Sequence, residues 1–230
     1  MSSPVELIVF DIAGTTVRDN GEIALAFQKA LQAFGYNVPV AEINPLMGYE
    51  KREAIRNMLK RYGETKKTFT PEYIASIHQR FLQEMIRYYQ ITTELVPLPN
   101  VEATFDELKS RRIKIALNTG FSKDITDVIM QRLAWVGKVD FVISSSEVAQ
   151  GRPYPLMIEA LMHKAGVTDP KKVIKVGDTE VDIREGQNAG CLYSVGITTG
   201  AFTRAALQPY HPSFIIDDIK EVLSIIDNAA

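Results

Sequence analysis

Five polar side chains lie at, or in the segments just after, the places where predicted strands end, and their types suit phosphoryl-transfer chemistry. They are Asp11, Thr119, Arg152, Asp178 and Asp182. In an open α/β sheet ligands bind beyond the carboxyl ends of the strands, so these side chains are expected to converge at one edge. Three converging carboxylates would repel one another and raise each other's pKa unless a cation sat among them.

The cation predicted for this edge is Mg²⁺, because the ligands available are oxygen atoms. The sequence has one cysteine, Cys191, which we expect to be a small buried residue, and its three histidines are far apart and expected to be structural or on the surface. The Arg152 guanidinium and the Thr119 hydroxyl would suit the oxygens of a phosphoryl group. Gly14 and its neighbour Thr15 could give backbone N–H groups to the same oxygens.

Alternating strand and helix patterns must position these side chains. Six apolar runs predict strands, and five helical patterns lie between and after them, so the predicted fold class is α/β with a doubly wound parallel sheet. The strand runs are Leu7–Phe10, Ile113–Leu117, Phe141–Ile143, Val173–Val176, Leu192–Val195 and the weaker Phe214–Ile216. The helical patterns are Val101–Arg111, Lys123–Val136, Pro155–Ala165, Asp182–Ala189 and Ile219–Ile226.

A helical insertion interrupts the alternation after the first strand. Ile23, Phe27 and Leu31 share one helical face, and 50–62 and 71–89 read as two further helices. Thr70 is the expected N-cap of the second of these, ahead of a proline in the first turn. We therefore predict an α/β core domain of residues 1–19 plus 95–230 and an all-helical cap domain of residues 20–94.

Composition argues for a small-molecule substrate. The chain has 230 residues, of which 46% are hydrophobic, and a formal net charge of −2 with both signs mixed along it. Binding to nucleic acid would need a basic face, and a membrane span would need about 20 consecutive apolar residues. Neither pattern is found, and the N-terminus carries no signal-peptide pattern, so we expect a cytoplasmic protein without nucleic-acid or membrane partners.

Four stretches of the sequence resemble the four motifs of the haloacid dehalogenase superfamily, in the same order. They are "FDIAGTT", "NTG", "GRPYP" and "GDTEVD", and the helical insertion is similar to the first cap class of that superfamily. The resemblance implies that Asp11 is a nucleophile that takes up a phosphoryl group, which Thr119, Arg152 and residues around Gly14, Thr15 and Gly120 would hold. It also implies that Asp178 binds Mg²⁺ with Asp11 and the carbonyl of Ala13. Asp182 would support the metal directly or through water.

Two departures from the common pattern resemble phosphonatase, the phosphonoacetaldehyde hydrolase branch of the superfamily. Most phosphatases of the superfamily carry an aspartate two residues after the nucleophile as a general acid, and here that residue is Ala13. Arg152 stands where the third motif usually has lysine. Phosphonatase cleaves a carbon–phosphorus bond, and it activates the leaving carbon by forming an imine between a cap lysine and the substrate aldehyde.

The stretch "LMGYEKREAI" resembles the phosphonatase cap motif and places Lys51 at the imine-forming position. Met47 and Gly48 are then expected to contact substrate. A third departure is Ala54, at a position where phosphonatase has a histidine. Proton transfer during imine formation would need another group, and the sequence offers Tyr49, Glu50 and Glu53 by proximity alone.

Simpler interpretations compete with these assignments. Lys51 lies in a segment that by default forms a solvated helix face, and Asp182 could be the N-cap of the helix that it begins. An ordinary phosphatase of small phosphate monoesters, or a non-catalytic binding module on the same fold, would share most of the motifs. The resemblance to phosphonatase further implies a homodimer formed through the cap.

Overall fold

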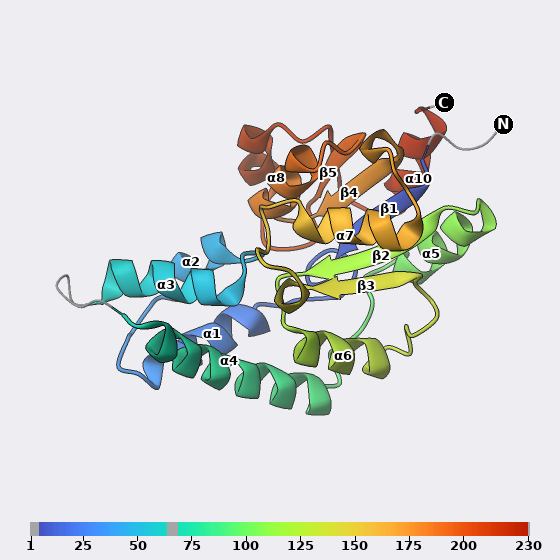
Figure 1. The fold of residues 1–230 in the computed structure, drawn as a ribbon. Helices are drawn as coiled ribbons and strands as arrows, with labels where there is room; N and C mark the ends of the chain where they lie inside the picture. Colours follow the sequence, from blue (N-terminus) through green and yellow to red (C-terminus); the bar gives the residue numbers. More distant parts are fainter. Residues whose placement is uncertain (1–4, 64–68, 230) are drawn as a thin grey trace.

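A six-stranded parallel sheet forms the centre of the molecule (Figure 1). The computed structural model describes residues 5–63 and 69–229; residues 1–4, 64–68 and 230, which the predicted domains include, lie outside the described residues. The strand order is β3-β2-β1-β4-β5-β6, which confirms the doubly wound sheet. The strands are β1 Leu7–Asp11, β2 Lys114–Thr119, β3 Phe141–Ser144, β4 Val173–Gly177, β5 Tyr193–Ile197 and β6 Phe214–Ile216.

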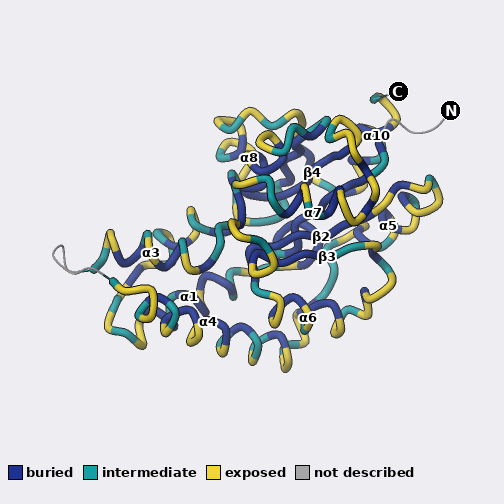
Figure 2. The backbone as a smooth tube through the Cα atoms, viewed as in Figure 1, coloured by how far each residue is buried: buried dark blue, intermediate teal, exposed yellow. Residues whose placement is uncertain are grey.

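Both faces of the sheet are covered, which explains why its strands are continuous apolar runs. Successive side chains of β1 point to opposite faces, so Leu7 and Val9 belong to one hydrophobic cluster and Ile8 and Phe10 to the other. The distribution of burial agrees with a sheet covered on both faces: the strands are buried, and the exposed residues lie on the outer faces of the helices (Figure 2).

The helices of the core largely follow the predicted segments. They are α5 Val101–Ser110, α6 Lys123–Arg132, α7 Leu156–Ala165, α8 Glu180–Asn188, the short α9 Arg204–Leu207 and α10 Glu221–Asp227. The prediction that α6 extends to Val136 was wrong, because the backbone leaves the helix and Ala134 has a φ of 53°. The predicted start of α8 was also wrong by two residues, since Thr179 and Asp182 form a capping box at its N-terminus.

The α-helices between β1 and α5 form a cap beside the sheet (Figure 1). They are α1 Glu22–Gln32, the short α2 Val40–Ile43, α3 Lys51–Tyr62 and α4 Pro71–Ile91. The Thr70 side chain accepts a hydrogen bond from the backbone N–H of Tyr73, which confirms the predicted N-cap of α4. None of the helices in the described part of the chain is both long enough and apolar enough to cross a membrane.

The sheet topology selects one edge for ligand binding. The chain runs outward from β1 through β2 to β3 and then crosses back to β4, which pairs with β1 on its other side. The strand order therefore reverses between β1 and β4, and the crevice beyond their carboxyl ends is the place where such sheets bind ligands. Asp11 ends β1, and Asp178 follows the last residue of β4.

Candidate functional site

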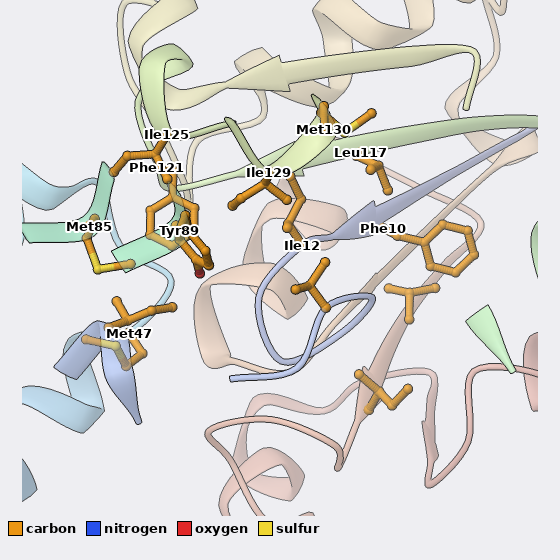
Figure 3. Close-up of a cluster of buried hydrophobic side chains, with 14 of the residues drawn as sticks. Phe10, Ile12, Met47, Met85, Tyr89, Leu117, Phe121, Ile125, Ile129 and Met130 are labelled. Atoms are coloured by element: carbon orange, nitrogen blue, oxygen red, sulfur yellow. The ribbon is translucent and has the colours of Figure 1, made fainter. Parts of the chain in front are cut away.

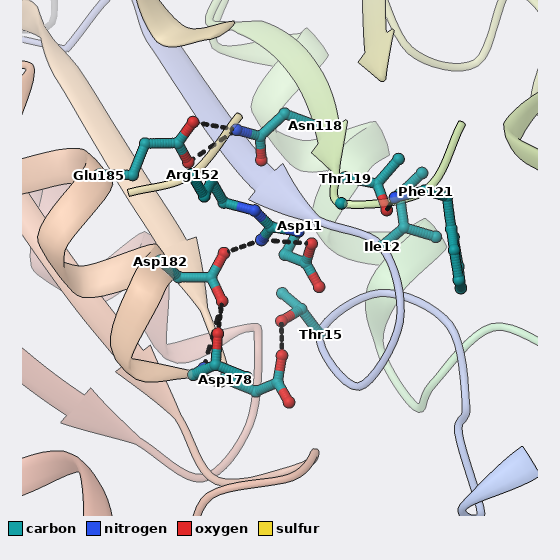
Figure 4. A network of polar contacts seen from close by, with 12 residues as sticks. Asp11, Ile12, Thr15, Asn118, Thr119, Phe121, Arg152, Asp178, Asp182 and Glu185 are labelled. Carbon is teal, nitrogen blue, oxygen red and sulfur yellow. Dashed lines mark hydrogen bonds and ion pairs between the residues drawn. The ribbon is translucent and has the colours of Figure 1, made fainter. Parts of the chain in front are cut away.

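The guanidinium of Arg152 joins two of the predicted carboxylates at this edge (Figure 4). Its Nη1 atom donates to Asp11 Oδ1 at 2.7 Å and also to Asp182 Oδ1. All three side chains are buried. The Nε–H of Arg152 is buried too and has no acceptor among the described residues.

Asp178 reaches the same point from the end of β4 (Figure 4). Its Oδ1 accepts from the Thr15 hydroxyl at 3.2 Å, and its Oδ2 accepts from the backbone N–H of Ala201 at 2.7 Å. A Cβ atom on Gly14 would lie 2.6 Å from Oδ2, so the loop after β1 closes directly over this carboxylate. Thr15 thus contacts the carboxylate through its side chain.

The three carboxylates have different electrostatic surroundings. Burial raises the pKa of Asp178 well above its usual value, and the nearby charges of Asp11 and Asp182 add to the effect. Burial also raises the pKa of Asp11, although Arg152 opposes the rise. At Asp182 burial acts in the same direction, but Arg152 and Lys175 outweigh it and lower the pKa to about 2.

The raised pKa of Asp178, next to an Asp182 that already has cationic partners, fits a cation bound beside Asp178. Oxygen atoms of Asp11, Asp178 and Asp182 lie within 4.8 Å of one another. Asp182 already has two cationic partners and a capping hydrogen bond from Thr179, whereas the contacts of Asp178 are to a hydroxyl and an amide. The donor set is oxygen throughout, which suits a hard divalent cation such as Mg²⁺. Asp182 therefore fits an indirect role better than direct coordination, and the N-cap alternative for it was wrong because it stands three residues after the N-cap.

A buried ionic network that the motifs did not predict lies behind the site. The ammonium of Lys175 on β4 lies 2.9 Å from Asp182 Oδ1, 3.6 Å from Glu185 Oε2 and 2.7 Å from Asn118 Oδ1. The Asn118 amide in turn donates to both oxygens of Glu185. Burial raises the pKa of Glu185 to about 7. A charged residue inside the apolar run Val173–Val176 was the sequence signal for this network.

Lys51 enters the site from the first turn of α3. Its side chain is 4% exposed, so the alternative of a solvated helix face was wrong. The Nζ atom lies 5.8 Å from the centre of the Phe121 ring and donates to the Tyr49 carbonyl at 3.4 Å. Burial, together with the positive charge of Arg152, lowers the pKa of Lys51 from 10.5 to about 8.

One small pocket, called the inner pocket below, brings most of the predicted residues together, whereas Gly14, Thr15 and Asp182 are not part of its lining. The cap contributes Met47, Gly48 and Lys51, and the core contributes Asp11, Ala13, Thr119, Gly120, Arg152 and Asp178. Its free volume is about 30 Å³, little more than one or two water molecules need. Met47 packs with Met85, Tyr89 and Phe121 in the hydrophobic cluster that joins cap and core (Figure 3). The cap is therefore closed over the site.

The inner pocket also contains Asp19, which sequence reasoning missed. The proton-transfer candidates that proximity suggested have other contacts. The Tyr49 hydroxyl donates to Glu180 at 3.3 Å, the Glu50 carboxylate caps α3, and Glu53 pairs with Arg56.

A second and larger cavity, called the outer cleft, shares Arg152 with the inner pocket. Its volume is about 780 Å³, and Arg52, Arg56 and His78 line it. After burial, the main cause that lowers the pKa of Lys51 is the positive charge of Arg152. His78 is buried, whereas His163 and His211 are exposed and Cys191 is buried as predicted.

Glycines allow the cap to pack directly on the core backbone. A Cβ atom on Gly120 would lie 2.8 Å from the carbonyl oxygen of Gly48 and 2.9 Å from that of Tyr49. A Cβ atom on Gly151 would lie 3.2 Å from the Cβ atom of Glu50. Side chains at these positions would hold the cap loop away from the site, so the closed pocket depends on their absence.

The substitution Gly120→Ala is expected to separate the cap loop from the core at this contact. The new methyl group overlaps two carbonyl oxygens of the cap loop, and the cap has to shift outward to relieve the contact. Labelling of Lys51 by acetic anhydride, followed by mass spectrometry, should then rise about tenfold relative to the wild type. Lys60, exposed on the same helix, serves as the internal reference. Equal labelling of Lys51 in both proteins would contradict the role given to Gly120.

A comparison with protein-family models matches residues 5–190 to the haloacid dehalogenase-like hydrolases. Curated relatives cover most of the chain. A phosphonoacetaldehyde hydrolase of Latilactobacillus sakei is 33% identical over 93% of this chain and 81% of its own length. A phosphonoacetaldehyde hydrolase of Bacillus cereus is 31% identical over 97% of this chain and 87% of its own length.

Solved structures share the fold. A phosphonoacetaldehyde hydrolase-like protein from Oleispira antarctica superposes with a TM-score of 0.85 at 25% identity, covering 99% of this chain and 93% of that one. A β-phosphoglucomutase from Clostridium difficile superposes with a TM-score of 0.81 at 20% identity, covering 98% and 96%. The second likeness concerns the fold alone.

Proposed function

The chain belongs to the haloacid dehalogenase-like hydrolases, and on that premise we propose that it hydrolyses the carbon–phosphorus bond of phosphonoacetaldehyde or a related carbonyl phosphonate. Two curated relatives, each about 30% identical over more than nine tenths of the chain, are named for this substrate. The proposal assigns the nucleophile to Asp11 and the imine-forming amine to Lys51.

The observation that carries the proposal is the presence of Lys51 and Asp11 on the wall of one closed pocket. A phosphatase of monoesters needs a group that protonates a leaving oxygen, and Ala13 cannot do so. A carbanion leaves poorly, and a proton donor helps it less than an electron sink does. A buried lysine with a lowered pKa beside the nucleophile supplies such a sink by forming an imine.

In the proposed reaction the uncharged amine of Lys51 adds to the aldehyde carbon and loses water to give an iminium. Asp11 then attacks phosphorus, so that an O–P bond forms and the C–P bond breaks. The electron pair of the broken bond moves into the carbon fragment, which becomes an enamine on Lys51. Water later hydrolyses the aspartyl phosphate, and protonation and hydrolysis of the enamine release the aldehyde.

The remaining side chains would hold the phosphoryl group and its charge. Arg152, with its unpaired Nε–H, and the Thr119 hydroxyl at the end of β2 would bind the phosphoryl oxygens. Asp11, Asp178 and the Ala13 carbonyl would hold Mg²⁺, which when bound would neutralise negative charge on the phosphoryl group. Met47 and Gly48 would contact the carbon fragment, since they line the pocket from the cap.

The rate of C–P cleavage is expected to rise with pH up to about 8. The reactive form of Lys51 is the neutral amine, and its lowered pKa of about 8 leaves roughly one tenth of it neutral at pH 7, against roughly one part in three thousand for a pKa of 10.5. A profile of kcat/KM should therefore rise about tenfold per pH unit below the pKa and level off above it. A rate that stays constant from pH 6.5 to 9 would contradict a neutral-amine nucleophile.

Phosphate release from phosphonoacetaldehyde, measured in parallel with a panel of small phosphate monoesters, tests the proposal. Turnover of the phosphonate at least about a hundredfold above the best ester is the expected result. The opposite preference would establish the phosphatase alternative. Binding of phosphate without turnover of any substrate would favour a binding module.

A further inference from the structure

We propose that Asp19 is the general acid–base that moves protons during formation and hydrolysis of the Lys51 imine, in the inner pocket that both residues line. The inference rests on the proposed function. It names a residue for the proton transfer that Ala54, which stands where phosphonatase has a histidine, cannot perform. Asp19 lies in the segment that joins β1 to the first cap helix.

Imine formation needs one group that both accepts and returns a proton. A carboxylate takes a proton from the Lys51 ammonium and leaves the neutral amine. The amine adds to the aldehyde, and a proton moves from nitrogen to oxygen to give the carbinolamine. The carboxyl group then returns its proton to the hydroxyl, which departs as water while the nitrogen lone pair forms the iminium. The carboxylate is regenerated, so protons and charge balance, and hydrolysis of the iminium runs the same steps in reverse.

Few residues of the inner pocket could perform this transfer. Among the described residues that line it, the titratable side chains are those of Asp11, Asp19, Lys51, Arg152 and Asp178. Asp11 is the proposed nucleophile, Asp178 is bound by Thr15 and Ala201 at the cation site, and Arg152 stays protonated between two carboxylates. Asp19 is the carboxylate of this set that has no other assignment.

The surroundings of Asp19 suit proton exchange. It is partly buried, and burial is the main cause that raises the pKa of its carboxyl group. Its negative charge is one of those that act on the Lys51 ammonium. The two side chains form no direct ion pair, and the pocket has room for about one or two water molecules, so we assign the proton transfer between them to a bridging water.

The other candidates face elsewhere. Tyr49, Glu50 and Glu53 are engaged by Glu180, by the N-terminus of α3 and by Arg56. His78 lines the outer cleft and is not among the residues that line the inner pocket. The nearest structural explanation for Asp19 is its turn at the start of α1, where Oδ1 accepts from the backbone N–H of Gly21 at 3.0 Å.

The substitution Asp19→Asn separates the two explanations, because an asparagine oxygen can still accept from Gly21 but the side chain carries no exchangeable acid proton. The enzyme is mixed with Mg²⁺ and phosphonoacetaldehyde, quenched at short times with borohydride and digested, and the rate of adduct formation on Lys51 is read by mass spectrometry. The inhibition constant of inorganic phosphate is measured alongside. The control is Glu94→Gln, at an exposed residue of the segment that leads from the cap back to the core.

Asp19→Asn should slow adduct formation about 10²- to 10⁴-fold, while phosphate inhibition in this variant and the rate of Glu94→Gln stay within about threefold of the wild type. Partial recovery in Asp19→Glu would support the assignment further. An Asp19→Asn rate within threefold of a wild type that does form the adduct would overturn the role of Asp19 and leave the proposed function standing. Loss of phosphate inhibition in Asp19→Asn would show a structural role and would overturn it too. A wild type that forms no adduct on Lys51 would overturn both proposals.

Discussion

Replacement of Asp11 by asparagine is expected to abolish turnover, with kcat falling by about 10⁴-fold or more. Asp11 ends β1 at the point where the strand order reverses, and its carboxylate is positioned by Arg152 at 2.7 Å. An amide oxygen occupies the same space but is a far weaker nucleophile toward phosphorus. The measurement is phosphate release from phosphonoacetaldehyde, with a single-turnover assay to detect slow residual chemistry.

Stability should move in the opposite direction to activity in this variant. Asp11 is a buried carboxylate among other carboxylates, and burial raises its pKa. Removing one negative charge relieves repulsion with Asp178, so the thermal unfolding temperature of Asp11→Asn should equal or exceed that of the wild type. Turnover above the level of a mock purification, in protein that unfolds as expected, would reject Asp11 as the nucleophile.

Lys51→Met is expected to lose C–P cleavage by about 10³-fold or more, because the leaving carbon then has no electron sink. The protein should remain folded. The Lys51 ammonium is buried with one long hydrogen bond to a carbonyl and an aromatic ring beside it, so an apolar side chain of similar length removes a desolvation cost. The measurements are phosphate release and thermal unfolding.

Lys60→Met is the matched control, since Lys60 is exposed on the same helix. It should behave as the wild type in both assays. Unchanged C–P cleavage in Lys51→Met would contradict the imine route. Hydrolysis of phosphate monoesters kept in Lys51→Met at wild-type rates, together with poor phosphonate turnover by the wild type, would favour the phosphatase alternative.

The fold was largely predictable because its sheet is covered on both faces. Burial of both faces makes each strand a continuous apolar run, and all six runs became strands. The errors lie at helix ends, because local side chains and backbone conformation determine at which residue a helix begins or ends. The Thr179–Asp182 capping box extends α8 toward its N-terminus, and the left-handed backbone at Ala134 accompanies the early end of α6.

Part of the site was predictable for a similar reason. Strand ends in a parallel sheet share one edge, so Asp11, Thr119 and Asp178 had to meet once the strands were assigned. Burial of Lys51 could not be read from the residues, since "EKREAI" has the composition of an exposed helix face and tertiary packing of the cap decides the outcome. Asp19 belongs to no motif, and its place in the pocket depends on how the joining segment folds back.

Borohydride trapping on the wild type tests the central claim most directly. Protein with Mg²⁺ and phosphonoacetaldehyde is reduced, digested and read by mass spectrometry, while phosphate release is followed in a parallel sample. The account predicts a reduced adduct on Lys51 together with release of phosphate. Phosphate release without an adduct would contradict the imine route, and absence of both would contradict the assignment of a carbonyl phosphonate as substrate.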